Sequence, residues 1–119
     1  MDDKNRSLLI DLICEVYRYS KSNDKLAIFV RQFQPNLYKK YESAALRLQK
    51  KLQVCLEAAN VEILELSGEY GPELPVEVLN MDDFEENDIL VISEFVEPVI
   101  KEKGSSQIIK YGKVLLKKK

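Results

Sequence analysis

The sequence contains no histidine and no tryptophan, and only two cysteines, four glycines and four prolines among 119 residues. It therefore lacks the common signatures of hydrolases, kinases and dehydrogenases, including a nucleophile elbow and a phosphate-binding glycine loop. Its carboxylates occur in surface-like runs, without the predicted burial or neighbouring charge that a general acid or base requires. We expect a protein that is not an enzyme and that uses no cofactor.

Long apolar runs are also missing. No stretch approaches the roughly 20 residues of a membrane helix, and the opening residues MDDKNRS lack the apolar centre of a signal peptide. These features predict a soluble, cytoplasmic protein without membrane contact. Cys14 and Cys55 lie on predicted apolar helix faces without CxxC spacing, so we expect buried thiols and no metal site.

Charge is unevenly distributed along the chain, although the net charge is only -2. Residues 1–60 carry eleven basic and seven acidic side chains, residues 61–100 carry twelve acidic and no basic ones, and residues 101–119 carry seven lysines and one glutamate. This segregation favours steering towards a charged partner, and solvated faces that maintain solubility explain it equally well. We expect no nucleic-acid partner, because the acidic segment repels phosphate, and we interpret the terminal KKK as a frayed tail.

Residues 1–60 have the periodicity of helices and are expected to form a helical hairpin or bundle. Turn-forming side chains at residues 20–24 interrupt the pattern, and Pro35 disfavours helical geometry at Gln34. Three helices are therefore predicted, at residues 7–19, 25–33 and 37–59.

The predicted N-caps are Ser7 or Asp3 for the first helix and Asn36 for the third. Apolar residues on the third helix recur at alternating spacings of three and four, namely Ala45, Leu48, Leu52, Cys55 and Ala59. The small core that each half of the chain offers favours association with a second copy. We expect a homodimer whose seam comprises Leu48, Leu52, Cys55, Leu9, Leu12 and Val16.

After Asn60, a predicted left-handed helix end, the hydrophobic period changes from 3.6 to two. Residues 61–119 are therefore expected to form a small antiparallel β-domain, which makes the protein α+β. Strands are predicted from Val61, at residues 76–79 and 89–96, and within residues 107–116 with a break around Gly112.

The segments between these strands are expected to be loops. Tyr70 and Leu74 are predicted to fold back onto the sheet, and Pro98 restricts the following pairing to an edge or a bulge. A turn is predicted at residues 103–106. The acidic run at residues 82–88 lacks the spacing and the glycine of a calcium loop, so we interpret it as solvated.

The junction LQKKLQVCLEAANVEILELSGEYGPELPVEVL resembles the GrpE-type nucleotide exchange factors, in which a helix ends before a GV-x-x-I strand and a GE-x-F-D-P-x-L-H-E-A-V loop. The matching positions are Asn60, Val61, Ile63, Gly68, Glu69, Tyr70, Pro72, Leu74 and Val78. Near the C-terminus, QIIKYGKVLL is similar to the family's R-V-L-R-P-A-x-V-x-V. The matching positions there are Ile108, Ile109, Lys110, Gly112, Val114 and Leu116.

The sequence also departs from the family. Tyr70 replaces a phenylalanine, Pro75 a histidine and Tyr111 a proline, and Pro98-Val99 stands at the family's Gly-Tyr pair. About six residues precede the first predicted helix, so the family's long stalk helix is not expected.

The resemblance implies a homodimer in which helices carry a β-wing, and the wing binds the nucleotide-binding domain of a DnaK-type chaperone so that ADP leaves. The contact residues that we expect are Phe95 as apolar anchor, Gln107 as polar contact, Lys110 in charge pairing and Leu116 as apolar contact. Sheet packing or solvation is the alternative role of each. A second hypothesis is a small α+β adaptor that binds a protein through its sheet edge without exchange activity, and a third is a GrpE-like fold recruited to another partner.

Overall fold

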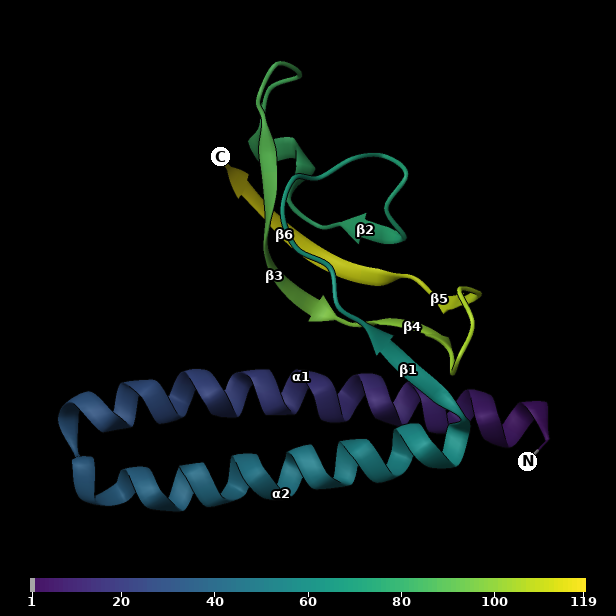
Figure 1. Ribbon diagram of the computed structural model, residues 1–119. Helices are drawn as coiled ribbons and strands as arrows, with labels where there is room; N and C mark the ends of the chain where they lie inside the picture. The colour runs from purple at the N-terminus through teal and green to yellow at the C-terminus, as the bar shows by residue number, and fades with distance from the viewer. Residues whose placement is uncertain (1) are drawn as a thin grey trace. The chain divides into compact units, whose positions relative to one another are not determined.

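A computed structural model describes residues 2–119, and the chain divides into two compact units, residues 1–60 and residues 61–119. Unit 1 is helical and unit 2 is built from strands (Figure 1). The α+β class is thus confirmed: a helical hairpin is followed by two small, mostly antiparallel sheets. The two units meet in sequence at Asn60, where the hydrophobic period changes.

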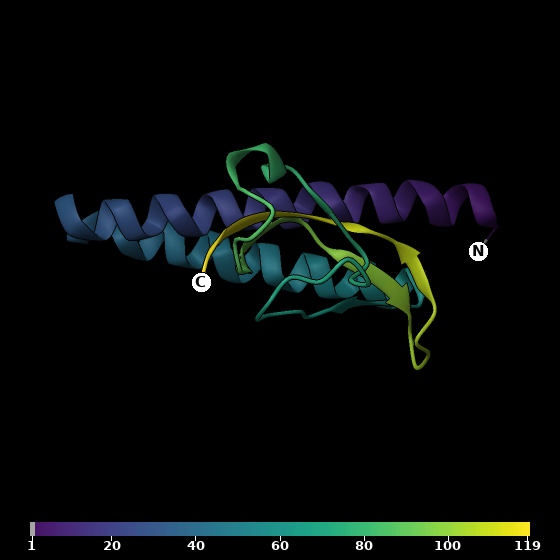
Figure 2. The same cartoon turned by 90° about the horizontal axis from the view of Figure 1, so that it is seen from above.

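Unit 1 consists of two long helices, α1 (Asp3–Phe33) and α2 (Pro35–Ala59). Figures 1 and 2 show them side by side in opposite directions. Side-chain hydrogen bonds connect the two helices. The Asn23 amide donates to the Tyr41 carbonyl at 3.1 Å, and Arg6 Nε donates to the Ala59 carbonyl at 3.1 Å. These bonds join residues far apart in sequence and fix an antiparallel hairpin.

The prediction of two helices before Pro35 was wrong, because α1 runs without a break through residues 20–24. Serine, asparagine and aspartate each cost a helix at most about 0.7 kcal/mol relative to alanine. Packing of the hairpin outweighs that cost. Within this segment Ser20 is buried, and Asn23 makes its bond to α2 instead of turning the backbone.

The predicted helix starts also need correction. The N-cap of α1 is Asp2, whose carboxylate accepts from the Asn5 N–H at 2.8 Å, and the helix starts before Ser7. Helix α2 begins at Pro35, which suits a first helical position because its missing N–H would have no helical partner there. Asn36 therefore lies inside the helix and is not its cap.

The prediction for the end of α2 was correct. Asn60 has φ 57° and ψ 46°, the left-handed conformation, and its N–H donates back to the Glu57 carbonyl at 3.1 Å. Asparagine tolerates this conformation better than most residues do. The next residue already belongs to a strand, so the cap residue is also the hinge between the helical and the β pattern.

Unit 2 contains six strands and one turn of 3₁₀ helix, η1. Their bounds are β1 (Val61–Leu64), β2 (Val76–Val78), η1 (Met81–Asp83), β3 (Leu90–Glu97), β4 (Val99–Glu102), β5 (Ile108–Lys110) and β6 (Gly112–Lys118). The sheets have the orders β1-β4-β5 and β2-β6-β3. The fully antiparallel arrangement that we predicted is wrong in one place, because β2 pairs with β6 in parallel.

The two sheets share one long antiparallel ribbon, made of β3-β4 and β5-β6. The half that contains Leu90 and Lys118 pairs β3 with β6. The half next to the turn at residues 103–106 pairs β4 with β5. The ribbon breaks between Glu97 and Val99, where Pro98 has no N–H for the ladder. In the opposite strand of the ribbon, a Cβ at Gly112 would lie 2.9 Å from the Glu97 carbonyl oxygen. Glycine therefore allows β6 to cross close to β3 at this break.

An apolar cluster joins the two sheets of unit 2. Its buried members are Val76, Leu90, Val99, Val114 and Leu116. Tyr70 and Leu74 pack against it, as predicted for the loop that contains them. The Tyr70 N–H also donates to the Leu90 carbonyl at 2.9 Å, so this loop is attached to β3 by backbone as well as by packing.

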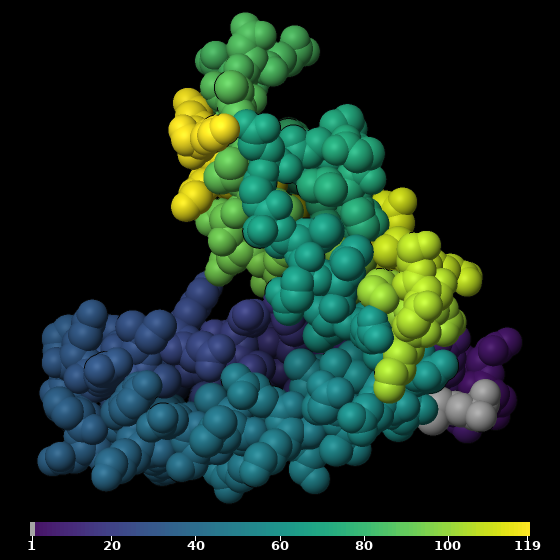
Figure 3. Space-filling view, viewed as in Figure 1, coloured from purple at the N-terminus to yellow at the C-terminus, as the bar shows by residue number. Residues whose placement is uncertain are grey.

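The terminal lysines do not form the frayed tail that we predicted. Strand β6 extends to Lys118, and the Lys119 N–H donates to the Ile89 carbonyl at 2.9 Å. In Figure 3 the C-terminal residues, in yellow, lie against the green segment that leads into β3. Backbone pairing with β3 therefore orders the end of the chain.

Candidate protein-binding surface

The β4–β5 turn, residues 103–106, is closed by several hydrogen bonds. Its backbone closes through Ser105 N–H to the Glu102 carbonyl at 3.2 Å and Glu102 N–H to the Gln107 carbonyl at 3.0 Å. The Ser105 hydroxyl accepts from the Gln107 N–H at 3.1 Å. A loop held in this way loses little conformational entropy when it binds.

Lys101 fastens this turn to the neighbouring strand. Its ammonium lies 2.7 Å from the carboxylate of Glu62, the residue directly opposite on β1, and donates to the Ser105 carbonyl at 2.9 Å. The hydrogen bond from Lys101 lowers the pKa of Glu62, and burial opposes that effect. The carboxylate therefore stays ionised to a lower pH than usual and keeps β1, β4 and the turn together.

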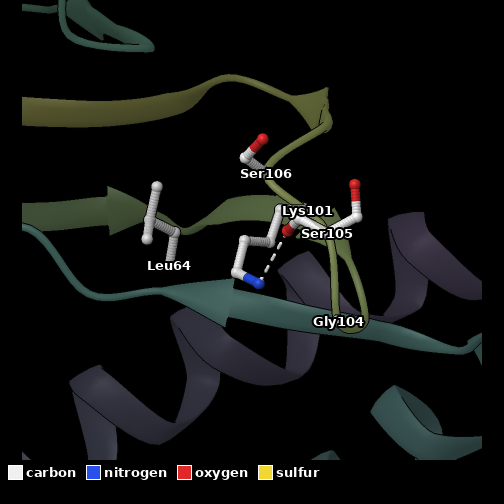
Figure 4. Close-up of a pocket in the computed structure, with 5 residues that line it drawn as sticks. All are labelled: Leu64, Lys101, Gly104, Ser105 and Ser106. Atoms are coloured by element: carbon white, nitrogen blue, oxygen red, sulfur yellow. Dashed lines mark hydrogen bonds between the residues drawn. The ribbon is translucent and has the colours of Figure 1, made fainter.

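A hollow of about 420 Å³ opens beside the turn. It is lined by Leu64, Lys101, Gly104, Ser105 and Ser106, which Figure 4 shows around the turn with the bond from Lys101 to Ser105. Leu64 provides an apolar wall, and the turn provides polar groups. The lining suits an apolar side chain of a protein partner flanked by groups that accept or donate hydrogen bonds.

Two of the four predicted contact residues lie on this same hairpin. Gln107 is exposed directly after the turn, and Lys110, partly buried, ends β5 opposite Ile100. We call the hollow together with Gln107 and Lys110 the hairpin surface. Sequence patterns alone missed Leu64 and Lys101, because their place beside the turn depends on pairing between β1 and β4.

The other two predicted contact residues face the core of unit 2. Leu116 is only 3% exposed and belongs to the buried cluster, which favours its alternative role in sheet packing. Phe95 is partly buried and packs against the same cluster. The alternation of β6 contained the signal for Leu116: it shares a sheet face with Val114, whereas Lys113 and Lys117 occupy the other face.

The residues of the predicted dimer seam lie on two helices and differ in their exposure. On α2, Leu48, Leu52 and Cys55 are partly buried, and α1 is the element that packs against this helix. Leu9 and Val16 on α1 are likewise partly buried within the single chain, whereas Leu12 is half exposed. The three α2 residues are therefore partly covered within the single chain, without a second copy. Both cysteines are reduced thiols, Cys14 buried and Cys55 partly buried.

The charges segregated in sequence are interleaved in unit 2. Lysines of the last nineteen residues reach carboxylates of residues 61–100 in ion pairs that include Lys101–Glu62, Lys113–Glu97, Lys118–Asp88 and Lys119–Glu69. Their lengths are 2.7, 3.8, 3.7 and 2.9 Å in that order. The charge segregation along the sequence therefore overestimates the electrostatic field around this unit, because β6 brings its lysines beside carboxylates of β3 and of the segment before it.

Comparisons with known proteins give no assignment: no family model, no curated protein and no solved structure matches the chain. Within residues 2–119, no group of three or more cysteine, aspartate or glutamate side chains is arranged to hold a metal ion. Neither α1 nor α2 carries an apolar stretch that would cross a lipid bilayer.

Proposed function

We propose that this chain is a GrpE-like binding protein, which contacts the nucleotide-binding domain of a DnaK-type chaperone through unit 2 and promotes ADP release. The main support is that the two stretches of family resemblance come together in space. Strand β2 from the first stretch pairs with β6 from the second, and β1 shares a sheet with β5.

The residues of these stretches also have clear local roles. Asn60 ends the helix in the left-handed conformation, Tyr70 anchors its loop on the core, and Gly112 allows the ribbon to cross at Pro98. These matched positions therefore have structural roles in this chain.

The mechanism requires no catalytic group. A partner that binds the open conformation of the chaperone more tightly than the closed one shifts the population towards the open form, by no more than that difference in affinity. The hairpin surface supplies a bonded turn and a hollow for an apolar side chain, and the resemblance assigns charge pairing to Lys110. Because the turn is fixed before binding, more of the contact energy remains for that discrimination.

The test is the release of a fluorescent ADP analogue from a DnaK-type chaperone, with this chain added at tens of micromolar. We expect faster release, weakened by Lys110→Glu. The matched control is Lys50→Glu, which makes the same charge reversal at an exposed position on α2 and should leave the rate unchanged. Unchanged release with the native chain would refute exchange activity.

A protein-binding adaptor is the second candidate, and the edge of the β1-β4-β5 sheet favours it. Strand β5 is the outermost strand of this sheet, so one side of its backbone is open to an added peptide strand. In this case the chain binds its partner through β5 but leaves nucleotide release unchanged. Measuring binding and release on the same chaperone separates the two functions.

A further inference from the structure

The end of the helical hairpin, where α1 is followed by α2, is both apolar and basic. We call residues 25–41 the helical tip. Its exposed large apolar side chains, between 45% and 67% exposed, are Leu26, Ile28, Phe29, Phe33 and Leu37. All residues from 31 to 37 are exposed as well. The connection between the two helices, at the left of Figure 1, therefore presents apolar side chains to solvent.

The apolar side chains of the helical tip lie on more than one face of α1. At 3.6 residues per turn, Leu26, Phe29 and Phe33 share one face, and the centroids of the two phenylalanine rings are 4.7 Å apart. Ile28 lies on the other side of the buried Ala27. A groove in a partner protein covers one face of a helix. The headgroup region of a bilayer, by contrast, closes around a tip from all sides.

The charge of the helical tip has one sign. Residues 25–41 carry Lys25, Arg31, Lys39 and Lys40, all exposed, and no aspartate or glutamate. The rest of residues 1–60 carries seven basic and seven acidic side chains, so it is balanced. The whole excess of positive charge of unit 1 therefore lies in the tip, beside its exposed apolar side chains. This pairing complements a surface that is anionic outside and apolar beneath.

Aromatic side chains are concentrated in the same segment. Four of the ten in the chain lie there, namely Phe29, Phe33, Tyr38 and Tyr41. The Arg31 guanidinium lies 5.3 Å from the centroid of the Tyr38 ring, so a cation and an aromatic ring are held together at the start of α2. Basic side chains with aliphatic stems reach lipid phosphates while neighbouring rings occupy the boundary below them.

We propose that the helical tip binds the surface of an anionic lipid bilayer. Arg31, Lys39 and Lys40 contact the lipid phosphates, and the Phe29 and Phe33 rings enter the boundary between headgroups and acyl chains. An acidic protein surface would match the charges but would leave one of the two apolar faces of α1 in water. The expectation of no membrane contact was based on the lack of a spanning segment, and surface binding needs none.

This proposal goes beyond the exchange activity proposed for unit 2 and does not depend on it. The tip belongs to unit 1 and lies at the opposite end of α2 from Asn60, roughly 36 Å along the helix axis. Nucleotide release is measured without lipid, and vesicle binding is measured without a chaperone. Failure of one proposal therefore leaves the other standing.

Cosedimentation of the full chain with vesicles is the first test, with vesicles of phosphatidylcholine alone or mixed with phosphatidylserine. We expect binding to the mixed vesicles, weakened by added salt. Replacing both tip lysines, Lys39→Glu with Lys40→Glu, should weaken it by at least about tenfold. The matched control is Lys50→Glu with Lys51→Glu, the same reversal at exposed positions on α2 outside the tip, which should have a much smaller effect.

Circular dichroism should show both double variants folded, because none of the four lysines is buried. No binding to the mixed vesicles, equal binding to both kinds of vesicle, or equal losses in the two double variants would overturn the proposal.

A fluorescence experiment tests whether the tip enters the bilayer. The chain has no tryptophan, so Phe33→Trp introduces a single probe into the tip. Its emission should move to shorter wavelength when mixed vesicles are added, whereas Val54→Trp, at a 62% exposed position on α2, should not respond. Unshifted emission at position 33 on bound vesicles would refute insertion. A shift that appears without lipid as the protein concentration rises would show that a second copy covers the tip instead, and would also overturn the proposal.

Discussion

Unit 1, the helical unit, and unit 2, the sheet unit, are almost equal in length, but they differ in how many large apolar side chains they leave exposed. Within residues 2–119, ten large apolar side chains of the helical unit are exposed, compared with four in the sheet unit. Three of the six buried apolar residues of the helical unit are small, Cys14, Ala27 and Ala59, whereas the sheet unit buries only valine, leucine and isoleucine in its core. The sheet unit therefore leaves fewer large apolar side chains exposed than the helical unit does.

This difference follows from geometry. A hairpin of two helices places only one narrow stripe of each helix against the other, and any second apolar stripe remains in solvent. In unit 2, by contrast, both sheets and the returning loop at Tyr70 close on a single cluster. A pair of long helices thus leaves apolar side chains exposed on its outer faces, whereas the strands of unit 2 share one cluster.

The largest expected effect contrasts a core leucine with an exposed one. Leu116→Ala should destabilise unit 2 by about 2–5 kcal/mol, through lost burial and a cavity. Leu12→Ala should change the stability of the monomeric chain by less than about 0.5 kcal/mol. Hydrogen exchange of unit 1 and unit 2 amides in the full chain, measured where the chain is monomeric, reports both values. Equal losses would remove the distinction between the two units.

The second prediction concerns the crossing of the ribbon in unit 2. A Cβ at Gly112 would lie 2.9 Å from both the Glu97 carbonyl oxygen and Val99 Cγ2, so Gly112→Ala should cost about 1–3 kcal/mol. Gly104→Ala provides a control in the hairpin turn. No atom lies within 4 Å of its Cβ, but φ is +73°, so we expect only the backbone strain of about 1–2 kcal/mol. Thermal unfolding compares the two, and a larger loss at Gly104 would contradict the importance of the close crossing.

Local signals in the sequence predicted the features of the fold that depend on neighbouring residues. The end of α2 at Asn60, the break at Pro98 and the turn at residues 103–106 each follow from the residue types present. The continuity of α1 was not predictable in this way, because packing against α2 outweighs the turn preference of residues 20–24. The parallel pairing of β2 with β6 joins segments more than thirty residues apart, and no local pattern encodes it.

The candidate surface was less predictable than the fold. Gln107 and Lys110 lie on the hairpin because they follow a recognisable turn. Leu64 and Lys101 were missed because only the register of β1 with β4 places them there. The sequence did contain a signal for the burial of Leu116, because this residue alternates with lysines along β6 and so belongs to the inner face of the sheet.

The third prediction concerns the hydrogen bond from Arg6 to the Ala59 carbonyl, which connects α1 to the end of α2. Arg6→Met keeps most of the aliphatic stem but removes the hydrogen bond to the Ala59 carbonyl in the last turn of α2. It also removes a positive charge that interacts favourably with the negative end of the helix dipole. We expect a loss of about 1–2 kcal/mol in unit 1. Arg47→Met, at an exposed position on α2, is the control. Denaturant unfolding followed by helical circular dichroism measures both, and equal midpoints would show that this hydrogen bond contributes nothing.

The smallest expected effect is the pH dependence of the Glu62–Lys101 pair in the sheet unit. The pKa of Glu62 is lowered in the folded chain, mainly by the hydrogen bond from Lys101. The pair therefore stabilises unit 2 above the ordinary pKa of 4.5 and loses this contribution as the pH falls through the lower, folded pKa. Because the Glu62 side chain is 42% exposed, solvent screens the interaction and the effect should be modest.

Glu62→Gln tests this dependence without changing the size of the side chain. At neutral pH the native chain should unfold at a higher denaturant concentration than Glu62→Gln, and the difference should shrink as the pH is lowered below 4.5. Glu65→Gln, an exposed glutamate just after β1, controls for the loss of one negative charge. A difference that stays constant down to the acid limit would mean that Glu62 acts through packing rather than through its charge. The Lys101–Glu62 pair would then add no electrostatic stability to the sheet unit, in contrast to the contribution expected from the Arg6 hydrogen bond in the helical hairpin.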